Sequence, residues 1–229
     1  LGAGLGVVGA IISMNVFSTP MAAFLISIPI FVAALLNSDR MFKLIPAVLI
    51  LLAMVASYNG HSLLKSAKPE RLPSIYQHWD AMAQIKMFAY PGDEARGMVI
   101  DNAANTPVYG FDGDFSLPDS GSEDLWGIPA GDLIRQFESC RFLSLGSGGG
   151  ADVIQALVEG AAEVHAVEVN PWFNKMLTEG DPAGYLSSYT DTLSSDLITL
   201  PEYTSQFYKD PRVTVVSEDA RAFIRRHTS

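Results

Sequence analysis

The chain has 229 residues, a hydrophobic content of 48% and a net charge of −10 at neutral pH. The acidic balance argues against nucleic acid as a partner, because phosphate groups need a basic face. The single cysteine, Cys140, excludes an internal disulfide framework and zinc sites of the CxxC type. Because the chain begins at Leu1 instead of Met and ends at Ser229 without a stop signal, we expect a fragment of a longer protein.

Three apolar runs come first, at residues 1–17, 19–37 and 44–58. The middle run has 19 residues without a charge. As an α-helix it would extend about 28 Å, which is close to the hydrocarbon thickness of a bilayer. Three such runs in succession disfavour both a buried hairpin of a soluble protein and a signal peptide. We therefore predict transmembrane helices over residues 1–58, with the lipid bilayer as a partner.

Charge separates this segment from the rest of the chain. Residues 1–58 have a net charge of +1, whereas residues 59–229 hold 13 basic and 24 acidic side chains, a net charge of −11. Three basic residues follow the third apolar run: Lys65, Lys68 and Arg71. The positive-inside rule then places the soluble part in the cytoplasm, with residues 59–74 as a linker at the membrane surface.

Short strand-like segments follow the linker. Residues 83–90 alternate in polarity, and residues 96–101 and 106–111 have the composition of strands. Residues 102–105, with the sequence NAAN, supply turn chemistry between the last two. We therefore predict a small antiparallel sheet in a β-rich domain over residues 75–136.

A glycine-rich turn marks the next domain. The sequence RFLSL at 141–145 is typical of a buried parallel strand, GSGGGA at 146–151 of a turn, and DVIQALVEGA at 152–161 of a helix. EVHAVEVN at 163–170 is the next predicted strand, and a predicted helix over 130–139 leads into the unit. This order of elements within about 30 residues gives weight to the pattern G-x-G-x-x-A, which is typical of nucleotide binding.

Two acids continue the pattern. Glu168 ends the second strand, where an acid can accept hydrogen bonds from both ribose hydroxyls of a nucleoside. The third predicted strand, RVTVV at 212–216, leads to Asp219, whose side chain can reach an adenine amino group. The sequence therefore predicts an adenosine-type ligand in a Rossmann-like domain over residues 137–229. We expect its parallel sheet to be truncated after the third strand.

Residues 143–171 and 210–226, together with MVIDNAANTPVY at 98–109, resemble the S-adenosylmethionine-binding methyltransferase fold and, more narrowly, the spermidine synthase family. The resemblance covers residues 75–229 and looks closest to the membrane-embedded bacterial spermidine-synthase-like proteins. It implies N-terminal transmembrane helices, a small antiparallel β domain and an α/β Rossmann-like sheet of the class I methyltransferase type. It also implies a place in the bacterial inner membrane with a cytoplasmic soluble domain.

The resemblance implies a transferase of polyamine biosynthesis that uses an S-adenosyl sulfonium donor and no metal. In the aminopropyl version, the donor is decarboxylated S-adenosylmethionine and the acceptor is an amine such as putrescine. The positions that match donor-binding residues of the family are Gly146, Ser147, Gly148, Gly149, Gly150, Glu168, Asp219 and Ala220. The catalytic aspartate of the family follows a fourth strand, so the resemblance places it beyond Ser229.

Two departures from the family pattern keep alternatives open. Spermidine synthases typically read G-G-G-D-G-G in the first turn, where the aspartate contacts the donor's amine, and this chain has Gly149 at that place. The family's Tyr-His-Glu stretch is not evident, and DLWGIPAGD stands in that region. The alternatives are an S-adenosylmethionine-dependent methyltransferase and a membrane transporter or sensor that binds a nucleoside without turnover. The sequence also leaves open whether the chain forms a homo-oligomer.

A long connection, residues 176–210, separates the second and third predicted strands of the parallel sheet. Connections of this length without secondary structure are uncommon in compact domains. Its tyrosines would either cover the ligand as a lid and hold an amine, or belong to a surface insertion: Tyr185, Tyr189, Tyr203 and Tyr208.

Overall fold

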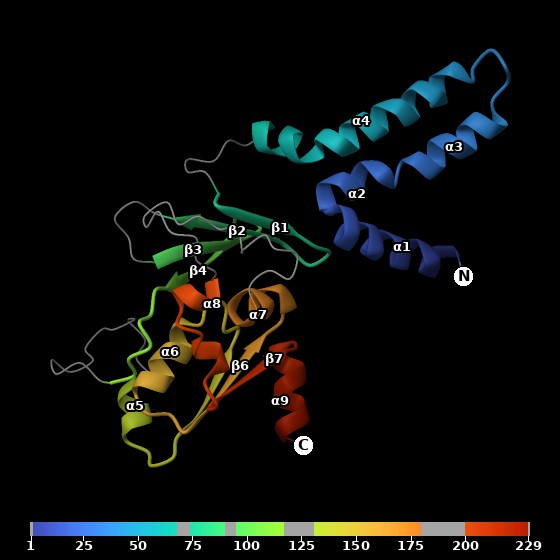
Figure 1. Cartoon of the computed structure of the whole chain (residues 1–229). Helices are drawn as coiled ribbons and strands as arrows, with labels where there is room; N and C mark the ends of the chain where they lie inside the picture. Colours follow the sequence, from blue (N-terminus) through green and yellow to red (C-terminus); the bar gives the residue numbers. More distant parts are fainter. Residues whose placement is uncertain (1, 68–73, 90–94, 117–130, 180–199, 229) are drawn as a thin grey trace. The chain divides into compact units, whose positions relative to one another are not determined.

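The chain divides into two compact units. The computed structural model describes residues 2–67, 74–89, 95–116, 131–179 and 200–228. Unit 1 consists of Leu1–Pro73 and Gln77–Ile85, and unit 2 consists of Ser74–Tyr76 and Lys86–Ser229. Figure 1 shows the helices of unit 1 in blue to teal and the parallel sheet of unit 2 in yellow to red.

Unit 1 is built on four helices: α1 (Gly2–Phe17), α2 (Thr19–Leu25), α3 (Ile28–Asn37) and α4 (Leu44–Ala67). The second apolar run, expected as one helix, is interrupted at residues 26–27. Pro29 explains the interruption, because it has no N–H to donate to the carbonyl group of Leu25. Ser27 closes the turn, since its hydroxyl donates to the Phe24 carbonyl oxygen at 2.6 Å.

Helix α4 packs closely on α2 through small side chains. The Ser57 hydroxyl donates to the Met21 carbonyl oxygen at 3.2 Å. A Cβ atom on Gly60 would lie 3.2 Å from the Pro20 carbonyl oxygen, so this position leaves no room for a side chain larger than alanine. The helix continues to Ala67 and thus occupies part of the segment that we expected as a linker, residues 59–74.

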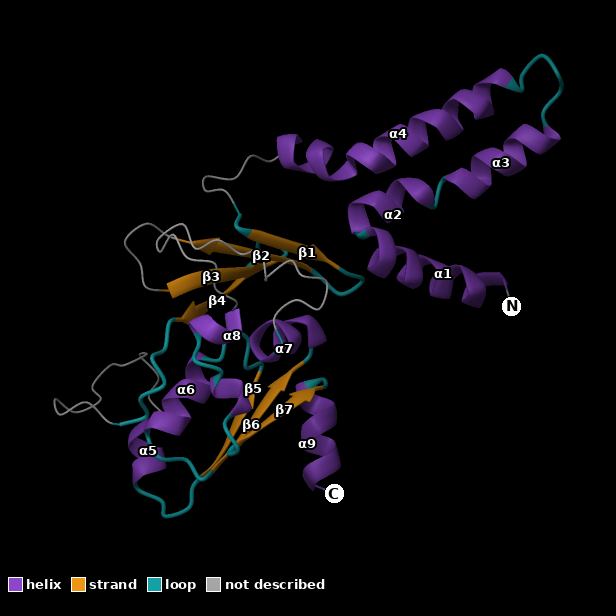
Figure 2. Cartoon of the chain, viewed as in Figure 1, coloured by secondary structure: helices purple, strands orange, loops and turns teal. Residues whose placement is uncertain are grey.

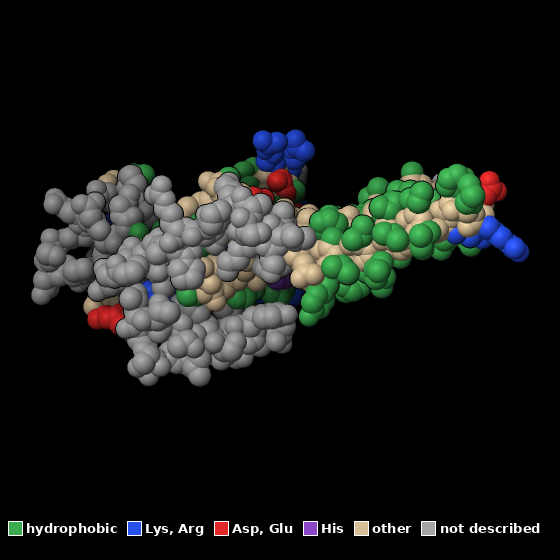
Figure 3. Space-filling model, turned by 90° about the horizontal axis from the view of Figure 1, so that it is seen from above, with side chains coloured by type: hydrophobic (Ala, Val, Ile, Leu, Met, Phe, Trp, Pro, Cys, Tyr) green, Lys and Arg blue, Asp and Glu red, His purple; other side chains and the backbone are tan. Residues whose placement is uncertain are grey.

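One helical run of the described residues, Thr19–Asn37, is long and apolar enough to cross a membrane. Helix α1 and residues Leu44–Gly60 are apolar but shorter. Length and composition alone give this result, and a buried helix of a soluble protein or a signal sequence passes the same test. Figure 3 shows hydrophobic side chains spread over the visible face of the helices. The exposed large side chains include Leu5, Ile30, Leu36, Leu44 and Leu51.

A four-stranded sheet has the order β1 (Tyr76–Trp79), β2 (Gln84–Ala89), β3 (Ala95–Ile100) and β4 (Ala104–Tyr109). Strands β3 and β4 are antiparallel, with Ile100 opposite Ala104. The turn between them contains Asn102 at a φ of 56°, and the Ala103 amide donates to the Ile100 carbonyl oxygen at 2.9 Å. The antiparallel sheet and its turn at NAAN confirm the sequence prediction.

A parallel sheet has the order β5 (Arg141–Leu145), β6 (Glu163–Glu168) and β7 (Val213–Ser217). The register aligns Leu143 with His165 and His165 with Thr214. All three strands were predicted from the sequence, with ends that differ by at most two residues. Figure 2 shows both sheets in orange.

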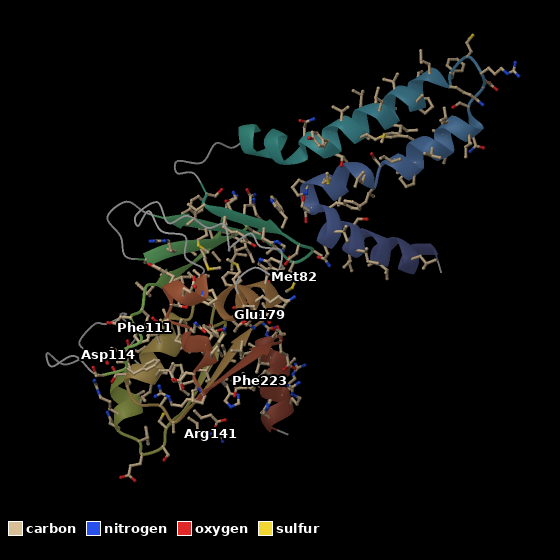
Figure 4. All side chains as sticks on the ribbon, viewed as in Figure 1. Met82, Phe111, Asp114, Arg141, Glu179 and Phe223 are labelled. Carbon is tan, nitrogen blue, oxygen red and sulfur yellow. The ribbon has the colours of Figure 1, made fainter. Side chains whose placement is uncertain are left out.

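Helices cover both sides of the parallel sheet: α5 (Gly131–Arg135), α6 (Ala151–Val158), α7 (Pro171–Thr178), α8 (Leu200–Tyr203), the 3₁₀ helix η1 (Phe207–Lys209) and α9 (Ala220–Thr228). Figure 1 shows α6 and α9 on opposite sides. Phe223 of α9, labelled in Figure 4, lies 6.0 Å from the His165 ring. The predicted helices over 130–139 and 152–161 are shorter in the structure. An antiparallel sheet joined to a parallel α/β sheet is compatible with a methyltransferase-like fold.

Candidate functional site

The carboxyl ends of the three parallel strands carry the residues selected from the sequence. Strand β5 is followed by the glycine loop, residues 146–150, and β6 ends at Glu168. Asp219 follows β7 by two positions. Because the strands are parallel and in register, their carboxyl ends meet at one edge of the sheet. The Glu218 amide donates to the Glu168 carbonyl oxygen at 3.2 Å, which ties two of these ends together.

Every amide N–H of the glycine loop donates to an acceptor within the protein. The donor–acceptor distances lie between 2.8 and 3.1 Å: Gly146 and Ser147 to the Val167 carbonyl oxygen, Gly148 to Glu168 Oε2, Gly149 to Thr106 Oγ1, and Gly150 to the Ser147 carbonyl oxygen. A loop that binds phosphate needs amides that point at the ligand. This loop directs its amides at protein acceptors instead.

Strand β4 packs directly on the glycine loop. A Cβ atom on Gly148 would lie 2.9 Å from Thr106 Oγ1. A Cβ atom on Gly149 would lie against the Pro107 carbonyl oxygen and 2.8 Å from its carbonyl carbon. A ligand that approaches these two glycines from this side must therefore displace β4. The contact also gives a steric reason for glycine at position 149, so that residue does not by itself favour a methyltransferase.

The two ends of the glycine loop differ in their surroundings. A Cβ atom on Gly150 would lie 2.6 Å from Cε2 of Tyr208, so the 3₁₀ helix η1 packs on the loop where α6 begins. Gly146 has open space on its Cβ side, and its φ of 78° lies in the region that favours glycine. Conformation alone therefore explains glycine at 146, whereas a φ of 80° and close packing both favour it at 150.

Glu168 is 7% exposed and fixes the glycine loop with its side chain. Its Oε2 accepts the Gly148 amide at 3.1 Å, and its Oε1 accepts the Asn170 amide at 2.9 Å. A carboxylate oxygen has two lone pairs, so each oxygen keeps one acceptor position for a ribose hydroxyl. No basic side chain pairs with Glu168 within the described ranges.

Asp219 caps helix α9, whose first residue is Ala220. Its Oδ1 accepts the amides of Arg221 at 3.0 Å and Ala222 at 3.1 Å. This capping role was not foreseen from the sequence. Asp219 is exposed, and its Oδ2 makes no hydrogen bond to any described residue, so this oxygen is available to an adenine amino group.

The structure adds Asp152, in the first turn of α6, to the residues selected from the sequence. The Ser144 hydroxyl of β5 donates to Asp152 Oδ2. Burial raises the pKa of the Asp152 carboxyl, against hydrogen bonds from Ser144 and the backbone that lower it. An acid directly after a glycine turn is the available sequence signal, although acids are also common in the first turn of helices without a ligand.

Tyr208 and Ser147 bring two buried hydroxyls to the glycine loop. Their exposed fractions are 3% and 4%, and neither hydroxyl has a hydrogen-bond partner among the described residues. Burial raises the pKa of Tyr208 well above its usual value, and the negative charges of Asp152 and Glu168 raise it further. The nearby Ser147 hydroxyl lowers the pKa of Tyr208 and so offsets part of this rise. The two hydroxyls nevertheless do not meet in hydrogen-bond geometry.

The other tyrosines of the long connection are placed differently. The Arg96 guanidinium lies 4.7 Å from the centroid of the Tyr203 ring, and a Cβ atom on Gly110 would lie 3.2 Å from that ring. Tyr203 thus packs beside the end of β4. Tyr185 and Tyr189 lie outside the described residues.

Comparisons with known proteins give a distant structural likeness. No protein-family model matches the chain, and no curated protein matches it. Among solved structures, a spermidine synthase in complex with the transition-state analogue AdoDATO superimposes with a TM-score of 0.39 and 14% sequence identity. The match covers 67% of this chain and 43% of that chain, so this chain spans less than half of the synthase's length.

Proposed function

We propose that unit 2 binds an S-adenosyl sulfonium compound and belongs to a spermidine-synthase-like transferase that moves an aminopropyl group to an amine. The observation that carries this proposal is the polarity of the glycine loop. Its amides are committed to protein acceptors, whereas the carboxyls of Asp152 and Glu168 have no basic partner among the described residues. Such a site suits a cation.

This polarity separates a sulfonium donor from a dinucleotide. The pyrophosphate of NAD carries negative charge and depends on free amides at the first turn of a Rossmann fold. The carboxyls of Glu168 and Asp152 beside the same turn would repel it. A sulfonium nucleoside carries positive charge and needs acceptors for its ribose and adenine groups, which Glu168 and Asp219 offer.

We assign donor binding to the residues selected from the sequence: Gly146, Ser147, Gly148, Gly149, Gly150, Glu168, Asp219 and Ala220. In the transfer, the amine nitrogen attacks the propyl carbon bonded to sulfur. The carbon–sulfur bond breaks, its electron pair stays on sulfur as a neutral thioether, and the nitrogen releases one proton. The sulfonium is already a good leaving group, so the protein's main task is to align amine and donor.

We further propose that α1–α4 lie in the bacterial inner membrane, with unit 2 in the cytoplasm, where its nucleoside ligand is made. The exposed apolar side chains of these helices support a lipid environment. A protease added outside intact cells should leave unit 2 uncut, and cleavage of unit 2 under those conditions would reject this orientation. Homo-oligomer formation stays a prediction.

The proposed reaction can be tested with full-length protein in membranes by mass spectrometry of the products. Decarboxylated S-adenosylmethionine and a diamine should yield 5′-methylthioadenosine and an aminopropylated amine in equal amounts. A methylated product from S-adenosylmethionine would replace this proposal with a methyltransferase. Donor binding without turnover of either compound would favour the transporter or sensor alternative.

A further inference from the structure

Two hydroxyls at the glycine loop are buried without a protein partner. Ser147 Oγ and the Tyr208 hydroxyl are inaccessible, and no described residue completes a hydrogen bond to either. Leaving a buried hydroxyl unpaired is costly, so native proteins seldom do it without a reason. The ring of Tyr208 packs on Gly150, which holds its hydroxyl at the loop.

The groups around these hydroxyls are acceptors. Asp152 and Glu168 lie near enough to Tyr208 for both charges to act on its hydroxyl. Glu168 takes its two hydrogen bonds from backbone amides, and Asp152 takes one from the Ser144 hydroxyl. In the described parts of the chain, the ion pairs involve other acids, such as Glu159 with Arg135 and Asp210 with Arg212. The half-buried Asp152 and the buried Glu168 therefore both lie near Tyr208, and neither is paired with a basic side chain among the described residues.

We propose that the hydroxyls of Ser147 and Tyr208, together with the carboxyl of Asp152, bind the ammonium group of the sulfonium donor. This subsite rests on the proposed function. An ammonium group has three N–H donors and no acceptor, which matches a set of oxygens that can all accept. Its charge also compensates the carboxyls of Asp152 and Glu168, which have no basic partner among the described residues.

The test compares two nucleosides on three variants of the full-length protein. Decarboxylated S-adenosylmethionine carries the ammonium, and 5′-methylthioadenosine lacks it. Tyr208→Phe and Ser147→Ala should each weaken binding of the first about ten- to a hundredfold, the usual effect of losing a hydrogen bond to a charged group. Binding of 5′-methylthioadenosine should be unchanged. Neither variant should lower the Tm, because the deleted hydroxyl has no protein partner.

Tyr76→Phe is the matched control. Its hydroxyl pairs with Trp172 Nε1 at 2.6 Å, so its loss should lower the Tm and leave both affinities unchanged. If Tyr208→Phe instead lowers the Tm and leaves both affinities unchanged, Tyr208 is structural and the subsite is wrong. Equal weakening of both nucleosides would also overturn it. If the wild type binds neither nucleoside, the proposed function fails and the subsite fails with it.

Discussion

The two units place their large apolar side chains in opposite ways. In unit 2, large side chains are buried, and Ile154, Phe173 and Leu177 are fully inaccessible. In unit 1, the buried positions of the helices are small, such as Ala22 and Ala53, whereas large side chains point outward. In water, the burial of large apolar side chains stabilises the folded state. In lipid, such burial adds little stability, and helices pack against one another through small residues. The contrast supports the proposal that the two units fold in different solvents.

The largest expected effect compares one truncation in each unit. Ile154→Ala should cost about 2–5 kcal/mol of the free energy of unfolding, because it leaves a cavity in the core of unit 2. Leu51→Ala should cost less than about 0.5 kcal/mol, because the Leu51 side chain is 62% exposed. Denaturant unfolding in detergent micelles gives both values. Equal losses for the two variants would remove the contrast between the units.

A second comparison uses two glycines that each face a proline carbonyl group. Gly149→Ala should cost about 1–3 kcal/mol or more, because the new Cβ atom meets the backbone of Pro107 and must push β4 away. Gly60→Ala should be nearly neutral. The new Cβ atom would lie 3.2 Å from the Pro20 carbonyl oxygen. A gain in helix propensity of about 1 kcal/mol offsets this close contact.

Gly146→Ala separates steric overlap from backbone strain at the glycine loop. Its Cβ atom would meet nothing within 4 Å, so only its positive φ opposes the substitution. We expect a loss of about 1–2 kcal/mol in thermal unfolding. A greater loss at Gly146 than at Gly149 would show that β4 does not press on the loop as described.

The smallest expected effect is a change in pH dependence. Burial raises the folded-state pKa of Asp152, so ionisation of this carboxyl opposes folding. Its penalty is absent below the unfolded-state pKa and grows as the pH rises through the folded-state pKa. Asp152→Asn should therefore gain stability relative to wild type as the pH rises from acid toward neutral, measured by unfolding at several pH values. A difference that shrinks with rising pH would contradict the burial of this acid.

Local patterns in the sequence predicted much of the fold. The three parallel strands follow from their short apolar runs and the glycine turn, and NAAN marks the turn between β3 and β4. The interruption between α2 and α3 was missed, although Pro29 is a local signal for it. The extension of α4 to Ala67 was missed because polar residues after the apolar run suggested a linker.

The candidate site was only partly predictable, because its contacts join distant segments. The sequence placed the glycines, Glu168 and Asp219 at one sheet edge. It gave no sign that Thr106 would bind the Gly149 amide, since these residues are separated by 43 positions. The partner of Glu168 is likewise a loop amide, which no residue pattern reveals. The packing of β4 on the glycine loop is therefore visible only in the structure.

The central claim is that the glycine loop accepts a sulfonium cation and not a dinucleotide phosphate. The most direct measurement is calorimetric titration of full-length protein in detergent with decarboxylated S-adenosylmethionine and, separately, with NAD. The amides of the glycine loop, which all donate to protein acceptors, and the carboxyls of Asp152 and Glu168 predict binding of the sulfonium compound and no binding of NAD. Binding of NAD without binding of the sulfonium compound would contradict the account.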